Sequence, residues 1–439
     1  MNYFTISCKI SRSLWLLFVT LIVTVLNGKE HEHPYLFFSA DDVPVFRERI
    51  ASNEWSAKAF ERMKTTVDSV ERIELPPPNS QIREEWRPVV QKYTKIGAYA
   101  AFLYVITEEE KYLDLAREYL MTFADGFEER INFHNIDQKD GIVIYDTGEL
   151  GTYSAWAYDM IYNQLSEAER TKVEEKLLKA IVETIRITVN GPSMQDLWAG
   201  VDDTGKRPRD YDWGPGQWNG NMYCNTGIAA IGFALQDEAI FEHTISNWKV
   251  YLERDMLADG MWQEEDFSYS RFCYASMQTV AEMAYQYGYE ENLYEWEVNA
   301  RDYTDWDPGY VDAPLTAPER KDSGKRNMRM FLDAQLDWQY PNLAPGNWGW
   351  QTNSASFLKK SEHVTFYELG YLRYADPVYG WVVNQMDRSL GNRYAQSDMS
   401  AILYSDPISE NEKKPSTASR WYDHSKWIVL KSIEGEAYW

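Results

Sequence analysis

The sequence has few of the residues that form metal sites, disulfide frameworks and basic surfaces. Its 439 residues include three cysteines and six histidines, and 44 lysines and arginines stand against 68 aspartates and glutamates. The net charge of −24 would repel a phosphate backbone, which argues against a nucleic-acid partner. The histidines are scattered and His31 and His33 look incidental, so we expect no metal and no cofactor. Cys224 and Cys273 can pair in an oxidising compartment, but we expect two buried free thiols.

Signatures of several large enzyme classes are also missing. There is no Gly-x-Ser-x-Gly elbow and no His-Glu-x-x-His zinc motif. Residues 200–207 nearly fit the phosphate-loop pattern, but no Ser or Thr follows the lysine, and Asp202 and Asp203 stand where phosphate would lie. The sequence therefore argues against an esterase of the elbow type, a zinc protease and a phosphate-loop protein.

Long hydrophobic runs are confined to the N-terminus. An apolar run over residues 14–26 follows Lys9 and Arg12, and its length suits the core of a signal peptide better than a membrane span. We therefore predict a signal peptide over residues 1–28, no stable membrane insertion once it is removed, and a secreted or periplasmic protein. An uncleaved membrane anchor is the alternative.

Most of the chain has a repeating helical pattern. Apolar helices are followed by polar N-terminal capping signals, Thr107 with Glu110 and Ser166 with Glu169, each of which predicts a capping box for the next helix. Helices of this length, joined by short turns and repeating as pairs, predict a mainly α fold of stacked αα-hairpins.

The pattern changes near the C-terminus. Residues 407–419 are polar and rich in Pro and Ser, residues 426–433 are β-rich, and residues 436–439 look like the start of another strand. A strand pair with nothing further to pack against is marginally stable. We interpret residues 401–439 as a linker and the first strands of a β-domain whose remainder is missing.

Two segments rich in aromatic and amide side chains are the candidate functional regions. Residues 213–227 (WGPGQWNGNMYCNTG) lead into an apolar helix and carry Asn219, Asn221 and Asn225. Residues 259–274 (DGMWQEEDFSYSRFCY) lead into a second helix. Because each segment ends a loop and begins a helix, both can face one cleft in a ring of hairpins. Aromatic residues make up 15% of the chain, enough to supply sugar-stacking surfaces as well as a core.

In these segments the chain resembles the alginate lyase and heparinase II/III-like polysaccharide lyases. The resemblance begins at residues 33–38 (HPYLFF) and extends to the C-terminus. Because each motif is short, the order of the motifs and their separation are stronger evidence for the resemblance than any single motif. It implies an incomplete (α/α) toroid, here residues 29–400, followed by an antiparallel β-sandwich. The family's Asn and Tyr positions fall on Asn219 and Tyr274, although Gly220 stands where many members have a histidine. Members also use a histidine from the sandwich, which is missing here.

The resemblance implies β-elimination on a uronic-acid polysaccharide such as alginate, ulvan or a glycosaminoglycan. Asn219 would offset the charge of the uronate carboxylate with a neutral amide. Tyr274 would take the C5 proton as the base, with its pKa lowered by Arg271 one helical turn earlier. The side chains expected to bind the anionic polysaccharide are Trp218, Asn221, Asn225, Glu264, Tyr269 and Arg207.

Other interpretations of the same residues stay open. Tyr274 can be a core tyrosine, Arg271 a solvated residue and Asn219 a helix cap. An (α/α)-toroid glycoside hydrolase would need two carboxylates flanking the bond, whereas residues 264–266 offer one acidic cluster. A non-catalytic glycan-binding fragment is a third alternative. The charge of −24 also suits a polyanionic substrate poorly, unless a basic cluster such as that around Arg207 dominates the local field.

Overall fold

The computed structural model describes most of the chain from residue 31 onward. The described ranges are 31–78, 80, 85–134, 142–190, 219–262, 267–299, 324–337, 364–385, 395–405, 413–416, 418–422, 427–431 and 437–438. The chain divides after Glu32 into two units, and every helix and strand named below lies in the second, His33–Trp439. Within the described ranges, no helix combines the length and the apolar character needed to cross a membrane. The predicted signal peptide lies outside the described residues.

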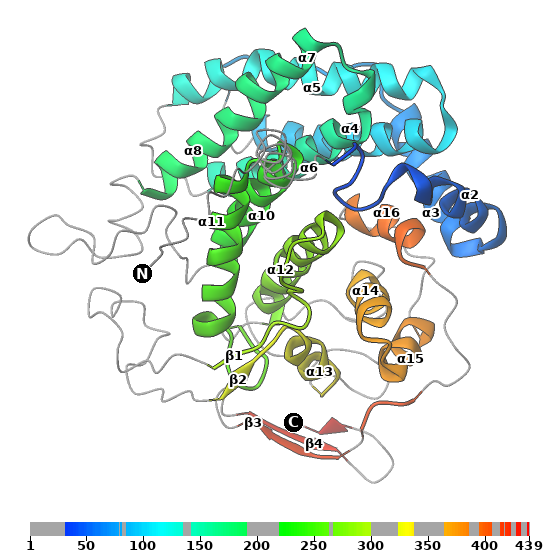
Figure 1. The fold of residues 1–439 in the computed structure, drawn as a ribbon, viewed down its shortest axis with the longest axis vertical. Coiled ribbons are helices and arrows are strands. Elements are labelled where there is room, and N and C mark those ends of the chain that lie inside the picture. The colour runs from blue at the N-terminus through cyan, green and yellow to red at the C-terminus, as the bar shows by residue number, and fades with distance from the viewer. Residues whose placement is uncertain are drawn as a thin grey trace, which may run out of the picture. The chain divides into compact units, whose positions relative to one another are not determined.

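A ring of inner helices forms the centre of the second unit (Figure 1). In chain order the inner helices are α4 (Arg87–Thr107), α6 (Ile142–Ile161), α10 (Asn219–Ala234), α12 (Phe267–Tyr287), α14 (Val364–Tyr374) and α16 (Ala395–Leu403). Each helix contacts the next one along the chain, and α16 also contacts α4.

Outer helices alternate with the inner ones along the chain, as the predicted hairpins require (Figure 1). They are α5 (Glu110–His134), α7 (Glu167–Val173), α8 (Lys179–Asn190), α11 (Glu238–Val250), α13 (Arg329–Asp337) and α15 (Pro377–Gln385), while α2 (Val43–Ser52) and α3 (Glu54–Asp68) precede α4. Shorter helical turns are η1 (Ala40–Asp42), η3 (Tyr162–Gln164), η4 (Glu174–Leu178) and η6 (Tyr251–Asp255). The mainly α class and the incomplete (α/α) toroid are confirmed.

One of the two predicted capping boxes is present. Ser166 accepts a hydrogen bond from the Glu169 backbone N–H at 3.3 Å, and the Glu169 carboxylate accepts one from the Ser166 N–H at 2.8 Å. The other prediction was wrong, because Thr107 is the last residue of α4 rather than the cap of the next helix. Glu108 turns the chain with a φ of 61°, and α5 begins only at Glu110.

The N-terminal segment is fixed to α6 by one buried aspartate. His33 Nδ1 lies 2.7 Å from Asp159 Oδ1, and the backbone N–H groups of Tyr35 and Leu36 both donate to Asp159 Oδ2 at 3.1 Å. The His33 ring also stacks on Tyr162 with the ring centroids 3.9 Å apart. His33 is therefore not incidental, as the sequence suggested, but part of the contact that fixes residues 33–36 to α6.

Glycines allow α6 and α10 to touch through their backbones. A Cβ atom on Gly227 would lie 2.5 Å from Gly148 O, and one on Gly148 would lie 2.7 Å from Tyr223 O. Further along, Gly151 lies beside Gly227. The residue numbers rise together on both helices, so α6 and α10 run parallel, and only residues without a side chain fit at this contact.

Substituting Gly227 by alanine should destabilise the protein. The new methyl group would meet backbone atoms that cannot move aside, and we expect a loss of about 1–3 kcal/mol in the free energy of unfolding. Chemical denaturation measures it. The matched control is Gly370→Ala in α14, where the added Cβ would meet the flexible end of Leu332 at 2.7 Å and lie in ordinary contact with the Tyr379 ring at 3.5 Å, with no backbone atom in the way. If both variants are equally stable, the close approach of α6 and α10 does not limit this position.

A buried ion pair joins α12 to α14. Glu282 is fully buried and pairs with Arg373, whose Nε donates to Glu282 Oε2 at 2.9 Å. Tyr294 OH donates to the same oxygen at 3.0 Å, and Gln286 Nε2 donates to Oε1 at 2.9 Å. Burial opposes the charge on Arg373, but Glu282 outweighs this effect, so the pKa of the guanidinium is raised.

Breaking this pair on one side should be costly. Glu282→Gln keeps the shape of the side chain but leaves the Arg373 charge buried without its counter-charge, and we expect a loss of about 3–5 kcal/mol in stability. The double variant Glu282→Gln/Arg373→Met should recover much of that loss, since no unpaired charge then stays buried. Denaturation of the two single variants and the double variant measures the coupling. Strictly additive losses would contradict an interaction between the two side chains.

Asp398 ties the last inner helix to the beginning of the ring. Arg62 of α3 donates to Asp398 Oδ1 from Nε and Nη2 at 3.0 and 2.7 Å, and Tyr99 OH of α4 donates to Oδ2 at 3.1 Å. Burial raises the pKa of the Asp398 carboxyl, while Arg62 opposes the shift. Ser56 Oγ of α3 adds a hydrogen bond to Ala401 O at 2.8 Å. These contacts join residues far apart in sequence.

Short antiparallel strands accompany the helices. Strand β1 (Val298–Asn299) pairs with β2 (Lys325–Arg326), and near the C-terminus β3 (Arg420–Tyr422), β4 (Trp427–Lys431) and β5 (Ala437–Tyr438) form a sheet in that order. The sheet contains the β-rich residues that the sequence indicated. Helix α16 extends past the predicted boundary at residue 400. A β-sandwich beginning in residues 401–439 stays a prediction.

Candidate functional site

The starts of α10 and α12 lie side by side. The rings of Tyr223 on α10 and Phe272 on α12 have centroids 5.9 Å apart. About one turn further along, Thr226 Oγ1 donates to Ser276 O at 3.4 Å. Residue numbers again rise together, so the two helices run parallel and begin at the same end. Asn219 lies one helical turn before Tyr223, so its backbone is level with the first turn of α12.

Tyr269 lies on the face of α12 that meets α10. Residues at positions i, i+3 and i+7 share one face of a helix, which groups Tyr269 with Phe272 and Ser276. Those last two residues make the contacts with α10. Tyr269 also lies in the first turn of α12 and is only half-buried.

Tyr274 lies on another face of α12, inside the core. Its ring stacks on Phe331 of α13 with centroids 4.1 Å apart and meets Phe366 of α14 edge-on at 5.6 Å. The side chain is 1% exposed, and its hydroxyl accepts a hydrogen bond from Gln278 Nε2 at 3.4 Å. Burial raises the pKa of the Tyr274 phenol well above its usual value. The expected lowering of this pKa by Arg271 was therefore wrong, because apolar surroundings disfavour a phenolate.

Asn225 is used to join two helices. It is 4% exposed, its Nδ2 donates to Thr244 O of α11 at 3.1 Å, and its Oδ1 accepts a hydrogen bond from Asn247 Nδ2 at 3.2 Å. The amide therefore faces α11 and is occupied there, which is why the predicted substrate contact of Asn225 is not retained. Asparagine content alone did not distinguish this structural amide from a functional one.

Other predicted site residues have a more limited description. Tyr269 and Arg271 are half-buried near the start of α12. Asn219 and Asn221 belong to α10 by their backbone, while their side chains lie outside the described residues. Trp218, Arg207 and Glu264 also lie outside the described residues. The roles expected for these side chains stay predictions.

The two cysteines beside this region are structural. Cys224 and Cys273 are both free and both buried, as expected. Burial raises the pKa of the Cys224 thiol, which keeps it protonated. Among the described residues, no group of His, Cys, Asp and Glu side chains is arranged to hold a metal ion.

Parallel inner helices gather several helix N-termini at one end of the ring. The contacts above show that α6, α10 and α12 begin at the same end, and the Arg373–Glu282 and Phe366–Tyr274 contacts extend this to α14. Each helix N-terminus carries roughly half a positive charge on its free N–H groups. Several such ends gathered together favour an anion locally, even though the whole chain has a net charge of −24.

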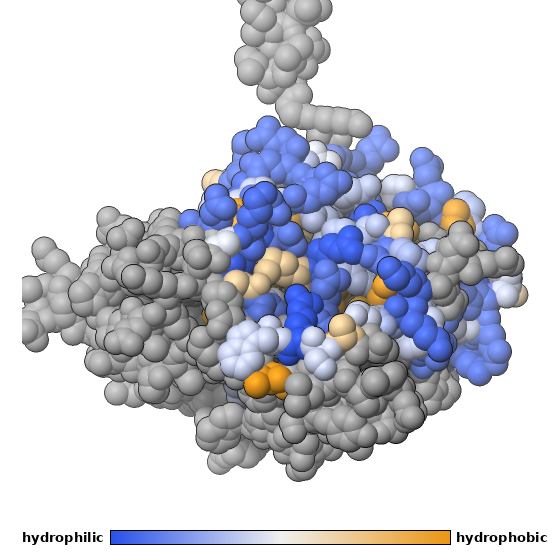
Figure 2. All heavy atoms as spheres, turned by 90° about the horizontal axis from the view of Figure 1, so that it is seen from below, coloured by the Kyte–Doolittle hydropathy of each residue, from blue (hydrophilic) through white to orange (hydrophobic). Residues whose placement is uncertain are grey.

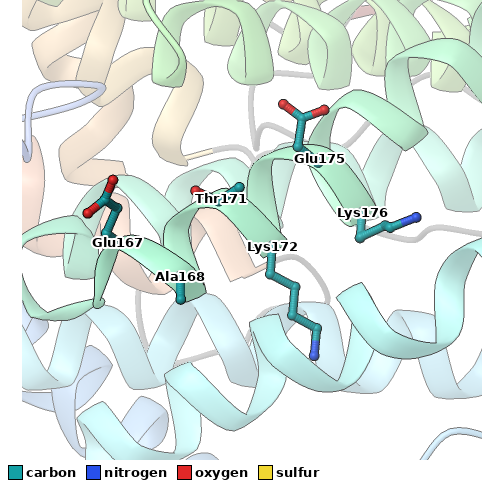
Figure 3. A pocket seen from close by; sticks show the side chains of 6 residues that line it. All are labelled: Glu167, Ala168, Thr171, Lys172, Glu175 and Lys176. Atoms are coloured by element: carbon teal, nitrogen blue, oxygen red, sulfur yellow. The ribbon is translucent and has the colours of Figure 1, made fainter.

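A pocket on the outer surface has no connection with this end of the ring. Its lining residues are Glu167, Ala168, Thr171, Lys172, Glu175 and Lys176, on α7 and η4. Figure 3 shows their side chains pointing in different directions along the helix rather than toward one point. Both lysines form ion pairs with acidic residues of α5, Asp125 and Glu128. We assign no function to this ion-paired helix surface.

The described part of the chain exposes few large hydrophobic side chains. Figure 2 shows one face on which the described side chains are mainly hydrophilic and the hydrophobic ones are isolated. The exposed large hydrophobic residues of the described part are Val45, Tyr285, Trp421 and Ile428, from four different elements. Many of the aromatic residues are buried instead, so much of the aromatic surplus belongs to the core.

No family model and no curated protein matches this chain, but solved structures do. A histidine-to-alanine variant of alginate lyase A1-III, an enzyme from Sphingomonas species A1, complexed with a tetrasaccharide, is 14% identical; the match covers 87% of this chain and 98% of the other, with a TM-score of 0.51. An alginate lyase from Bacteroides ovatus is 12% identical, with 85% and 100% coverage and a TM-score of 0.50. The chain has the alginate lyase fold. This confirms the resemblance at the level of the fold.

Helices α10 and α12 both begin earlier than the sequence predicted: α10 starts at Asn219 rather than near residue 228, and α12 starts at Phe267 rather than near residue 274. The sequence analysis also missed Tyr223 and Phe272, the residues whose contact aligns the two starts. With 3.6 residues per turn over residues 267–287, Tyr269 and Phe272 lie on one face of the helix and Tyr274 lies on another. This periodicity could have been recognised from the sequence. Which of the two faces meets α10 became known only from the packing.

Proposed function

We propose that the protein is a secreted polysaccharide lyase that cleaves a uronic-acid polymer by β-elimination. The observation that supports this is the alignment of the first turns of α10 and α12 through Tyr223 and Phe272. It puts the backbone of Asn219 and the half-buried Tyr269 on neighbouring parallel helices, at the end where helix N-termini gather. Structures that share the fold are alginate lyases, so alginate is the first substrate to test.

Asn219 is the residue proposed to offset the carboxylate charge. The C5 proton of a uronate is weakly acidic because it lies next to a carboxylate, and removing it pushes further negative charge onto the carboxylate oxygens. A neutral amide donor stabilises that charge where it develops and avoids burying a counter-ion. Asn221 and the positive end of α10 would add to the effect. Glu264 and Arg271 are proposed to contact the substrate nearby.

Tyr269 is the proposed base, in place of the buried Tyr274. As a phenolate it would take the C5 proton, the electron pair of that bond would form the C4–C5 double bond, and the C4–O4 bond would break. The phenol could then return its proton to the departing O4 on the same face of the sugar. The positive end of the α12 dipole favours a phenolate in the first helical turn.

A substrate screen tests the proposed function directly. Purified protein is incubated separately with alginate, ulvan and a glycosaminoglycan, while ultraviolet absorbance and reducing ends are followed together. A lyase raises both signals, because each cleavage leaves an unsaturated uronate. An increase in reducing ends without absorbance would indicate hydrolysis and contradict the proposal. Binding without any turnover would identify a glycan-binding protein.

A further inference from the structure

Arg87 and Asp146 form an ion pair at the starts of two inner helices. Arg87 is the first residue of α4, and its Nε lies 3.5 Å from Asp146 Oδ1 near the beginning of α6. The Asp146 side chain is 2% exposed, whereas the Arg87 side chain is 39% exposed. The carboxylate therefore lies beneath the surface, and the cation that it orients extends from it toward solvent.

This pair belongs to the same end of the ring as the proposed active site. Gly148 of α6 lies against Tyr223 of α10, and Asp146 precedes Gly148 by half a helical turn. Asp146 is therefore level with the first turn of α10, where Asn219 stands. Helix α6 separates α4 from α10, and the axes of packed helices are about 8–10 Å apart. Arg87 and Asn219 therefore begin helices that are two positions apart in the ring, with α6 between them.

The chemistry of the pair suits a polymer that carries one carboxylate on each sugar. Asp146 contacts Arg87 through Nε, and the guanidinium has further N–H donors on both Nη atoms in a planar arrangement that matches a carboxylate. A buried counter-charge fixes the direction of the side chain, which lowers the entropy lost when it binds a ligand. We propose that Arg87, positioned by Asp146, binds the carboxylate of a sugar unit other than the one cleaved. This inference rests on the proposed lyase function.

The experiment compares substrate length and substitution at Arg87. With an alginate hexasaccharide, Arg87→Gln is expected to raise KM about 10- to 100-fold while kcat changes less than about threefold, because one charged contact is lost away from the reacting atoms. Arg87→Lys should recover part of the loss. With a trisaccharide, which is too short to reach Arg87 from the cleavage point, variant and wild type should have the same KM.

The positioning role of Asp146 has its own readout. Asp146→Asn removes the counter-charge but leaves Arg87 in place, so KM for the hexasaccharide should rise by a smaller factor of about 3–10, and adding Asp146→Asn to Arg87→Gln should have little further effect. Arg47→Gln is the matched control, since Arg47 is 45% exposed and forms an ion pair with Glu108. That control should keep the wild-type KM, and circular dichroism should show the same helical content in every variant.

Three results separate the inference from the function on which it rests. A wild-type KM for Arg87→Gln with the hexasaccharide, or an equal effect with the trisaccharide, overturns the inference and leaves the lyase function standing. If the wild type cleaves none of alginate, ulvan and the glycosaminoglycan, calorimetry measures its Kd for the hexasaccharide; a Kd weakened about 10-fold or more in Arg87→Gln supports the carboxylate contact although the lyase proposal fails. Absence of both cleavage of the three polymers and binding of the hexasaccharide by the wild type overturns both.

Discussion

Tyr269→Phe should lower kcat for the cleavage of a uronate polymer by a factor of about 10²–10⁴, with little change in KM. The substitution removes one oxygen atom, the only atom of the side chain able to exchange a proton. Because Tyr269 lies half-buried in the first turn of α12, its ring should keep its place when the hydroxyl is lost. Initial rates of ultraviolet absorbance at several substrate concentrations give kcat and KM separately.

Tyr274→Phe is the matched control for that experiment. The Tyr274 hydroxyl is buried and makes a 3.4 Å hydrogen bond with Gln278, so its removal should cost about 0.5–1.5 kcal/mol of stability and leave kcat within about threefold of the wild type. The opposite pattern, with activity lost in Tyr274→Phe and kept in Tyr269→Phe, would restore Tyr274 as the base. It would also require the core around Phe331 to open during catalysis.

Asp159→Ala should be among the most destabilising single substitutions in the protein. The Asp159 carboxylate is 2% exposed and receives the backbone N–H groups of Tyr35 and Leu36 as well as the contact from His33. Its removal leaves two buried N–H donors without an acceptor, each worth about 1–3 kcal/mol. We expect a total loss of about 3–5 kcal/mol in the free energy of unfolding, measured by urea denaturation.

Two further variants make the Asp159 result interpretable. Asp114→Ala removes a carboxylate that is 71% exposed and pairs with Arg117 on the same helix, so stability should change by less than about 0.5 kcal/mol. Asp159→Asn keeps an acceptor oxygen but loses the negative charge, and it should fall between the wild type and Asp159→Ala. If Asp159→Ala is as stable as Asp114→Ala, the HPYLFF segment is not held by this residue.

The class of fold was readable from the sequence because helical periodicity and capping are local. Apolar residues recurring at the helical period predicted the hairpins, and Ser166 with Glu169 marked the start of α7 correctly. The same kind of signal failed at Thr107, because a residue at a helix end can serve either the helix before it or the helix after it. The left-handed backbone conformation of Glu108 ends α4, so Thr107 belongs to the helix before it.

The sequence alone determined that the protein is mainly helical, acidic and rich in aromatic residues, and that residues 213–227 and 259–274 lead into two helices. Only the tertiary structure decided which side of each helix meets its neighbour. A helix presents side chains in every direction, and the packing of α10 and α13 left Tyr269 on the face of α12 that meets α10 and buried Tyr274 against Phe331. Tyr269 is half-buried, whereas burial raises the pKa of Tyr274 well above its usual value. Tyr274 is therefore the less suitable base, because apolar surroundings disfavour a phenolate.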